Sequence, residues 1–171
     1  MIRLGTINDL DDCYSIVLDA KEFMKQTGSL QWQQGYPYKE NIEKDLLSKT
    51  MYVYDDGGII KGMIALKQEF TKNYVDITGA WVYPPSDDDL VVHRLAVKKE
   101  YRGMGIAKEL MAFAIDYARK NNIHHLKTDT HPLNIAMQRT AEGAGFVRRG
   151  TVISMLEKLD GLRYAYELIL E

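Results

Sequence analysis

An arginine and two glycines, spaced for anion binding, stand between an apolar segment and an amphipathic one. Residues 102–107 read RGMGIA and follow the β-branched run Val91–Val97 and a short charged turn. Glycine lets the backbone come close to a ligand, and the first amides of a helix lack intrahelical partners. Arg102 adds a forked cation suited to phosphate oxygens. The segment predicts a phosphate or pyrophosphate site, unless the glycines serve only a tight strand-to-helix turn.

Two common phosphate-binding motifs do not fit this segment. A dinucleotide fingerprint requires Gly-x-Gly-x-x-Gly, but Lys108 stands where the third glycine belongs. A nucleoside-triphosphate loop requires Gly-Lys-Ser or Gly-Lys-Thr, and neither tripeptide occurs in the chain. The predicted phosphate ligand therefore belongs to another class.

Histidine and carboxylate residues near this segment could serve as proton donors or acceptors. By strand alternation, His93 shares a face with Leu95 and Val97, and histidine titrates near neutral pH. It could act as a general base, or it could be packed in the sheet with both nitrogens satisfied. Asp129 and His131 end the next predicted strand and could orient a polar ligand, or they could tie a strand-end turn.

A metal site at the same strand is not expected. His125, Asp129 and His131 share a strand face, and three protein ligands suffice for zinc. However, His125 lies too far along an extended strand from His131 to share one ion.

The elements that position these residues alternate between strands and helices. Hydrophobic periodicity predicts helices at about 6–25, 39–48, 106–121 and 134–142. It predicts strands at Met1–Leu4, Met51–Tyr54, Ile59–Leu66, Tyr74–Trp81, Val91–Val97, His125–Asp129, Phe146–Ser154 and Arg163–Leu170. The single cysteine, Cys13, falls on the apolar face of the first helix, which indicates a buried structural thiol. The pattern is of the α/β type.

Two motifs together resemble a known family. Arg102–Ala107 fits Arg-x-x-Gly-x-Gly/Ala after a strand that ends in Leu95-Ala96-Val97. Downstream, Asn134 is a plausible N-cap of a helix that ends before Gly145-Phe146. This resembles the acetyl-CoA site of the GNAT superfamily, the GCN5-related N-acetyltransferases, closely over residues 91–149 and in outline over nearly the whole chain.

The resemblance implies a fold, a donor and a reaction. The fold is a mixed, mostly antiparallel twisted sheet, splayed at its centre and flanked by helices. A neutral amine attacks the thioester of acetyl-CoA directly, while backbone amides of the splayed strand hold the acyl oxygen. By position, the resemblance assigns cofactor binding to Leu95, Ala96, Val97, Arg102, Gly103, Met104, Gly105, Ile106, Ala107, Asn134 and Met137.

The sequence departs from the family at one mechanistic position. Many members place a tyrosine in the helix before Gly-Phe, as the acid that protonates the departing thiolate. Counting back from Gly145-Phe146, that position is Ala141. The usual acid is therefore absent, which leaves His93 as the candidate catalytic residue.

The loop between the first two predicted helices is rich in aromatic residues. Trp32 and Tyr36 lie in it, and in GNAT folds this connection usually lies over the substrate cleft. We expect these two residues, with Asp129 and His131, to bind the acceptor. Aromatic anchoring of the loop on the core is the other interpretation.

Length, charge and composition limit the remaining classes. The 171 residues predict a single domain over 1–171, and 46% hydrophobic and 27% charged residues are ordinary for a globular protein. A net charge of −2 argues against nucleic acid or an anionic membrane as the partner. No apolar run is long enough to span a membrane, and the N-terminus does not resemble a signal peptide. We therefore expect a cytoplasmic location. In this family C-terminal strands often form dimers, so a homodimer through Thr151–Leu170 is possible.

The sequence therefore predicts an acetyl-CoA-dependent N-acetyltransferase acting on the amine of a small molecule. Two alternatives stay open. One is an acyl-CoA-binding sensor or scaffold with little turnover, which the alanine at Ala141 favours. The other is an acetyltransferase that acts on a protein amine.

Overall fold

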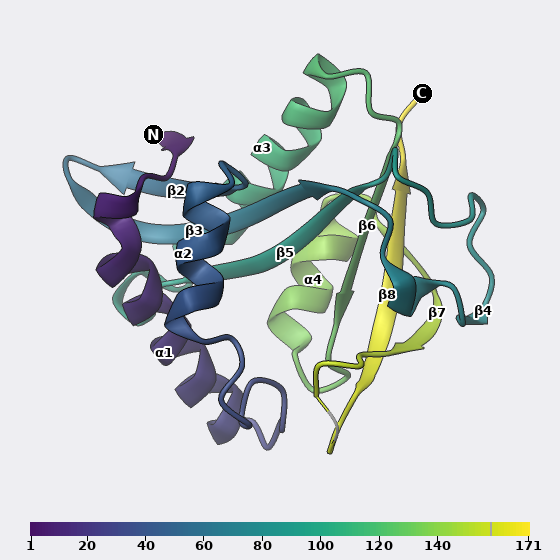
Figure 1. Cartoon of the computed structure of the whole chain (residues 1–171), viewed down its shortest axis with the longest axis horizontal. Coiled ribbons are helices and arrows are strands. Elements are labelled where there is room, and N and C mark those ends of the chain that lie inside the picture. Colours follow the sequence, from purple (N-terminus) through teal and green to yellow (C-terminus); the bar gives the residue numbers. More distant parts are fainter. Residues whose placement is uncertain (158) are drawn as a thin grey trace.

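The computed structural model describes residues 1–157 and 159–171. The eight strands of these residues form one sheet in the order β1-β2-β3-β5-β6-β8-β7-β4, shown in Figure 1. The strands are β1 Ile2–Leu4, β2 Met51–Asp56, β3 Ile59–Gln68, β4 Thr78–Gly79, β5 Leu90–Val97, β6 His125–Thr130, β7 Val147–Ile153 and β8 Leu162–Ile169. The helices are α1 Leu10–Gln26, α2 Lys39–Leu47, α3 Ile106–Lys120 and α4 Ile135–Gly143, with 3₁₀ turns at Ile7–Asp9, Lys72–Tyr74 and Lys99–Tyr101.

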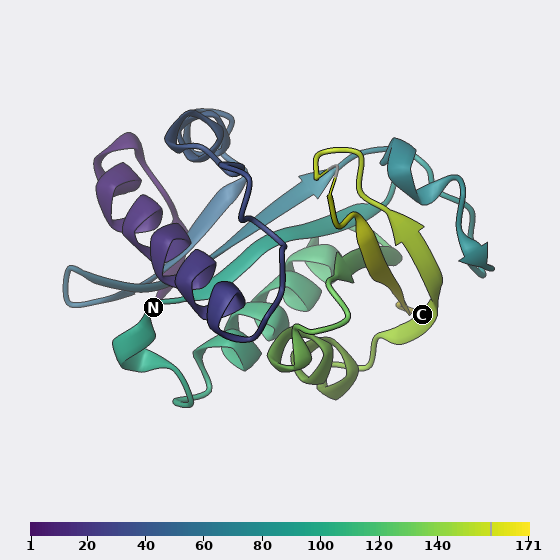
Figure 2. The same cartoon turned by 90° about the horizontal axis from the view of Figure 1, so that it is seen from below.

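Two helical layers cover the sheet. Helices α1 and α2 lie on one face and α3 and α4 on the other, as Figure 2 shows from below. Cys13 of α1 and Ile42 of α2 belong to the core of the first face. Leu110 of α3 and Tyr166 of β8 belong to the core of the second face. The predicted burial of Cys13 is confirmed, since its exposed fraction is 0%.

The sheet opens between its two central strands. β5 and β6 run parallel and pair only at Leu90–Leu126 and Val91–Lys127, whereas the other neighbouring strands are antiparallel. Beyond Val91 the two strands separate, as Figure 1 shows. The predicted mixed sheet, splayed at its centre and flanked by helices, is confirmed.

A β-bulge lies where β5 leaves β6. Two residues of β5, Arg94 and Leu95, lie opposite a single residue of β3. Arg94 adopts φ = 50°, which is uncommon for a residue other than glycine. Because the bulge shifts the alternation, His93 shares a face with Ala96 and not with Val97. The prediction that His93 lies on the face of Leu95 and Val97 is therefore wrong.

Helix α3 packs against β3 at Gly62. A Cβ atom at Gly62 would lie 3.0 Å from Ile106 Cγ2 and 3.1 Å from Leu110 Cδ1. Glycine therefore lets the first turns of α3 rest directly on the sheet, which fixes the start of that helix beside the end of β5.

One predicted strand is mostly wrong. Within Tyr74–Trp81 only Thr78–Gly79 pairs in the sheet, and Tyr74 ends a 3₁₀ turn. The aromatic residues there pack against Val91, Val152 and the sheet, so their apolar pattern reflects burial, not strand pairing. The other predicted strands are confirmed, with ends shifted by a few residues. In the part of the chain described, no helix is long and apolar enough to cross a membrane.

Candidate active site

The segment 102–107 forms the predicted turn at the start of α3. Gly103 and Gly105 have φ values of 78° and 82°, which favour glycine, and Gly105 is the N-cap of α3. Within the described residues, and apart from chain neighbours, no heavy atom lies within 4 Å of the place where either residue would carry a Cβ. The backbone conformation therefore requires glycine here, and the space over the first amides of α3 is open to an anion.

Arg102 is held beside this turn by α1. Its Nη2 donates to the carbonyl of Asp19 at 3.0 Å, and its guanidinium carbon lies 4.8 Å from the centroid of the Phe23 ring. The carboxylate of Asp19 also accepts the amide N–H of Lys99 at 3.1 Å. Because Arg102 stays exposed, its other N–H groups can reach a phosphate.

A cavity of about 430 Å³ runs from this turn along β5, and we refer to it as the glycine-turn groove. Ala20 and Phe23 of α1 form part of its apolar wall. All residues predicted to bind the cofactor line it except Met104, which is 64% exposed. A cationic mouth with free helix amides and an apolar wall suits a long ligand with a diphosphate at one end.

Asn134 caps α4 as predicted. Its Oδ1 accepts the amide N–H of Met137 at 3.1 Å. Both residues line the glycine-turn groove, and both also line a second cavity of about 300 Å³, which we call the polar cleft. Met24 and Leu95 are likewise shared by the two cavities. The groove and the cleft therefore meet beside the opening between β5 and β6.

His93 lines the polar cleft and is paired with Glu69. Its Nε2 lies 2.9 Å from Glu69 Oε1. The hydrogen bond to His93 lowers the pKa of Glu69, so this carboxylate is ionised at neutral pH and can only accept. Nε2 therefore carries a proton, and Nδ1 of the neutral ring holds the lone pair.

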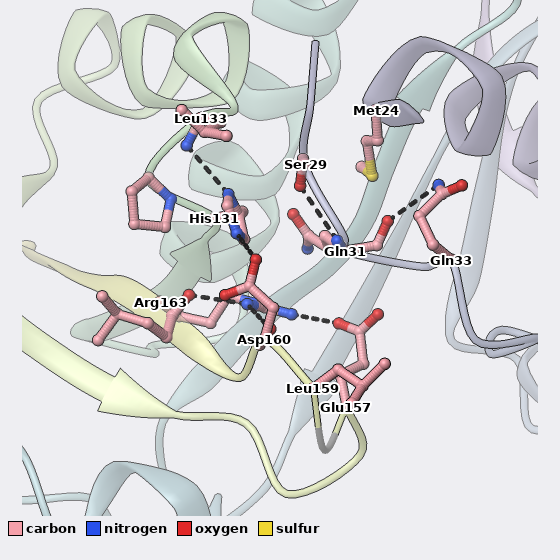
Figure 3. A network of polar contacts seen from close by, with 12 residues as sticks. Met24, Ser29, Gln31, Gln33, His131, Leu133, Glu157, Leu159, Asp160 and Arg163 are labelled. Atoms are coloured by element: carbon pink, nitrogen blue, oxygen red, sulfur yellow. Dashed lines mark hydrogen bonds and ion pairs between the residues drawn. The ribbon is translucent and has the colours of Figure 1, made fainter. Parts of the chain in front are cut away.

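His131 has a different environment. Its Nδ1 accepts the amide N–H of Leu133 at 3.0 Å, and its Nε2 lies 2.5 Å from Asp160 Oδ2, as Figure 3 shows. The residue is 4% exposed and does not line the polar cleft. Both ring nitrogens are engaged within the protein. Because His131 lies outside the cleft that the other predicted acceptor residues line, the structure does not bring it together with them.

The same network continues toward the loop after α1. Arg163 Nη1 donates to the Asp160 carbonyl at 2.8 Å, and its Nη2 pairs with the carboxylate of Glu157, as seen in Figure 3. Glu157 also accepts the amide N–H of Trp32. These bonds join the segment between β7 and β8 to the aromatic loop at the edge of the polar cleft.

Three predicted acceptor residues do line the polar cleft: Asp129, Trp32 and Tyr36. Asp129 Oδ2 accepts from the Tyr74 hydroxyl at 2.6 Å. Burial raises the pKa of Tyr74 well above its usual range, so this hydroxyl stays protonated. Trp32 is 8% exposed and belongs to the core beside α1, so it anchors the loop as well as lining the cleft.

An ionic cluster beside the cleft was not predicted. Asp45 Oδ1 lies 2.8 Å from Lys67 Nζ, and Asp45 Oδ2 lies 2.6 Å from Arg94 Nη1. Lys67 and Arg94 line the cleft. Two sequence features could have revealed this cluster: an aspartate on the buried face of α2 and an arginine inside an apolar strand, since buried charges are usually paired. The pairing of Glu69 with His93 could not be predicted in this way, because Glu69 follows the end of β3, where a charged residue is ordinary.

The alanine at the family's acid position is inside the core. Ala141 is 0% exposed and packs among the buried residues under α4. The neighbouring Thr140 lines the groove, but its hydroxyl donates to the Ala136 carbonyl at 2.9 Å. Within residues 1–157 and 159–171, no group of three His, Cys, Asp or Glu side chains could hold a metal ion.

Known proteins share this architecture. A GNAT-family acetyltransferase crystal structure from Streptococcus agalactiae 2603 is 29% identical, with a TM-score of 0.85 over 100% of this chain and 95% of that chain. A Bacillus anthracis acetyltransferase in complex with acetyl coenzyme A is 24% identical, with a TM-score of 0.54 over 71% of this chain and 62% of that chain.

Sequence comparisons agree with the fold. The curated N-alpha-acetyltransferase 30 of Saccharomyces cerevisiae is 41% identical over 54 residues, which is 32% of this chain and 31% of that protein. The chain spans about a third of the length of the curated relatives it matches. The profile described as "Acetyltransferase (GNAT) family" matches residues 10–146, which include every residue that lines the glycine-turn groove. The chain therefore belongs to the GNAT acetyltransferase family.

Proposed function

We propose that the chain is an acetyl-CoA-dependent N-acetyltransferase that moves an acetyl group to a primary amine of a small molecule. The observation that carries this proposal is the meeting of the glycine-turn groove with the polar cleft at Met24, Leu95, Asn134 and Met137. A donor in the groove and an acceptor in the cleft would come into contact there.

The groove fits the donor. The open backbone at Gly103 and Gly105, the first amides of α3 and the exposed Arg102 suit the diphosphate. Asn134 and Met137 lie where the pantetheine arm would pass toward the cleft. When bound, acetyl-CoA supplies an activated acetyl thioester. Leu95–Val97 lie on the part of β5 that no longer pairs with β6, and the backbone N–H groups of this segment that face the opening would bind the acyl oxygen.

Proton transfer is assigned to His93. An ammonium must lose its proton before it can act as a nucleophile, and Nδ1 of His93 holds the lone pair because Nε2 is bound to Glu69. Glu69 thereby orients the ring. Through Nδ1, directly or by one water, His93 takes the proton and passes it to solvent. The CoA thiolate that leaves when the C–S bond breaks takes a proton from water.

The size and walls of the polar cleft favour a small molecule as the acceptor. Its volume is about 300 Å³, and its wall includes Trp32 and the segment tied by Glu157. A protein amine is the alternative supported by the likeness to a protein named N-alpha-acetyltransferase 30. A sensor with little turnover is supported by the buried Ala141, since α4 there offers no phenol to the departing thiolate.

A homodimer also belongs to this proposal. Five large apolar side chains of the segment between β7 and β8 and its flanks are exposed: Ile153, Met155, Leu156, Leu159 and Leu162. Light scattering of the purified chain tests whether this segment joins two copies. A monomeric mass at micromolar concentration would remove the dimer and leave the enzymatic proposal intact.

Isothermal titration with acetyl-CoA, followed by a thiol-release assay over a panel of amines and peptides, tests the function. Binding with release on a small amine supports the proposal. Release only on peptides supports the protein-amine alternative, and tight binding without release supports the sensor. No binding would contradict all three, since each needs the groove.

A further inference from the structure

One wall of the polar cleft carries surplus positive charge. Lys67 Nζ and Arg94 Nη1 lie 2.8 Å and 2.6 Å from the two oxygens of the same carboxylate, Asp45. The side chains of Asp45 and Arg94 are only 2% and 8% exposed. Since one carboxylate neutralises one cation, this triad keeps a net charge of about +1 where water screens it poorly.

Arg94 also keeps an unused donor. Its Nη2 donates to the Tyr36 hydroxyl at 2.7 Å, but its buried Nε has no acceptor within the described part of the chain. A buried N–H without an acceptor is costly. The bulge, with φ = 50° at Arg94, places this guanidinium in the wall of the cleft. A carboxylate is the acceptor that matches both the charge and the forked geometry.

The cleft also carries two carboxylates, Asp129 and Glu69, whose hydrogen-bond partners are not permanently charged. Asp129 accepts from the Tyr74 hydroxyl, which is neutral because burial raises its pKa. Glu69 is ionised and bonded to His93, and the charges of Lys67 and Arg94 also lower its pKa, so it offsets part of the positive charge of the triad. Both carboxylates line the same cleft as Lys67 and Arg94. Among the described residues that line the cleft, the remaining charged pair, Arg163 with Glu157, balances itself.

We infer that the acceptor is a small amino-carboxylate, such as an amino acid, whose carboxylate binds at Arg94 and Lys67. Its ammonium then lies toward Asp129 and the Glu69–His93 pair. This inference rests on the proposed function and names the substrate class of that site. A polyamine or a plain alkylamine has no anion to offer to the triad.

The test compares amino acids with their C-terminal amides in the thiol-release assay. These pairs differ only in the carboxylate, so the ratio of their kcat/KM values isolates the group that Arg94 is proposed to bind. We expect the acids to be favoured about tenfold or more, as is typical of hydrogen bonds to charged groups. Equal or higher kcat/KM for the amides would overturn the inference.

Two pairs of variants locate the effect. Arg94→Gln should remove the preference for the acid, so that the ratio of kcat/KM for acid and amide falls toward one. Arg119→Gln is its matched control, because Arg119 also pairs with an aspartate, Asp116, at 3.6 Å, but on the exposed surface of α3. If Arg94→Gln does not fold, judged by thermal melting, Lys67→Met takes its place, with exposed Lys120→Met as control. An unchanged preference in the folded cleft variant would overturn the inference.

A binding measurement separates this inference from the proposed function. In the presence of CoA, N-acetylated amino acids are titrated against the corresponding N-acetylated amides. Tighter binding of the acids, lost in the cleft variant, supports the amino-carboxylate class even if no turnover is found. Absence of thiol release on every amine would then contradict only the enzymatic proposal. Equal binding of acid and amide would overturn the inference by itself.

Discussion

The side-chain hydroxyl of Thr128 donates a hydrogen bond of 2.9 Å to the carbonyl oxygen of Val92. This bond lies one residue beyond the last paired position of β5 and β6, Val91–Lys127. Both residues are almost completely buried, with exposed fractions of 1% and 3%. A side chain therefore satisfies the backbone at the point where the ladder stops, so the sheet can open without leaving a buried carbonyl unpaired.

Thr128→Val should destabilise the protein without changing its core volume much. The substitution removes the donor and leaves the Val92 carbonyl buried without it, which costs about 1–3 kcal/mol. Chemical denaturation followed by circular dichroism measures the loss. Thr140→Val is a control, because the hydroxyl of Thr140 serves an exposed helix carbonyl. Equal stability of Thr128→Val and the parent would show that the bond does not support the opening.

His93→Ala should slow acetyl transfer by about 10²–10⁴-fold at neutral pH, which is the usual contribution of general acid–base catalysis. The loss should shrink at high pH, where more of the amine is already neutral. The measurement is the pH dependence of kcat/KM for variant and parent. A ratio of the two kcat/KM values that stays constant over the whole pH range would show that His93 is not the base.

Glu69 should add no inflection to that profile above pH 4.5. Its hydrogen bond to His93 lowers its pKa in the folded protein from the ordinary value of 4.5. The interaction is therefore fully present above pH 4.5 and is lost only as the pH falls through the lowered value. In Glu69→Gln the amide cannot hold the proton on Nε2 in the same way, so activity at neutral pH should fall. Activity equal to the parent would contradict the orienting role of Glu69.

Arg102→Glu should weaken acetyl-CoA binding about tenfold or more while leaving the melting temperature nearly unchanged. The change places a negative charge at the mouth of the glycine-turn groove, and Arg102 is an exposed residue with a single hydrogen bond to α1. Calorimetric titration measures the affinity. Arg119→Glu provides a charge-matched control on the far part of α3. If Arg102→Glu binds acetyl-CoA with the affinity of the parent, Arg102 does not contact the pyrophosphate.

Cys13 should be unreactive in the folded protein. Burial raises the pKa of its thiol to about 12, with further contributions from Asp9 and Asp12, and its exposed fraction is 0%. The thiolate that reacts with disulfide reagents is therefore scarce at pH 8 and shielded from them. Titration with such a reagent should give no signal in buffer and one thiol per chain in denaturant. Rapid reaction of the native protein would show that α1 opens readily.

The sequence by itself determined the parts of the site that are local. A strand, a glycine turn and an amphipathic helix follow one another between Val91 and Lys120, and the Asn134 cap is made within four residues. Such features depend on backbone preferences and short-range hydrogen bonds, which composition and spacing reveal. For the same reason almost all predicted groove residues line one cavity.

Only the tertiary structure decided which side chains line the polar cleft. The register of β5 on β3 contains the bulge at Arg94, and one extra residue moves His93 to the opposite face. The partners that give the cleft its charges, Glu69 for His93 and Asp45 for Arg94, lie 24 and 49 residues away in the chain. Pairings at such distances are selected by packing of the whole fold, because many registers satisfy the same local pattern and only one buries these charges with partners.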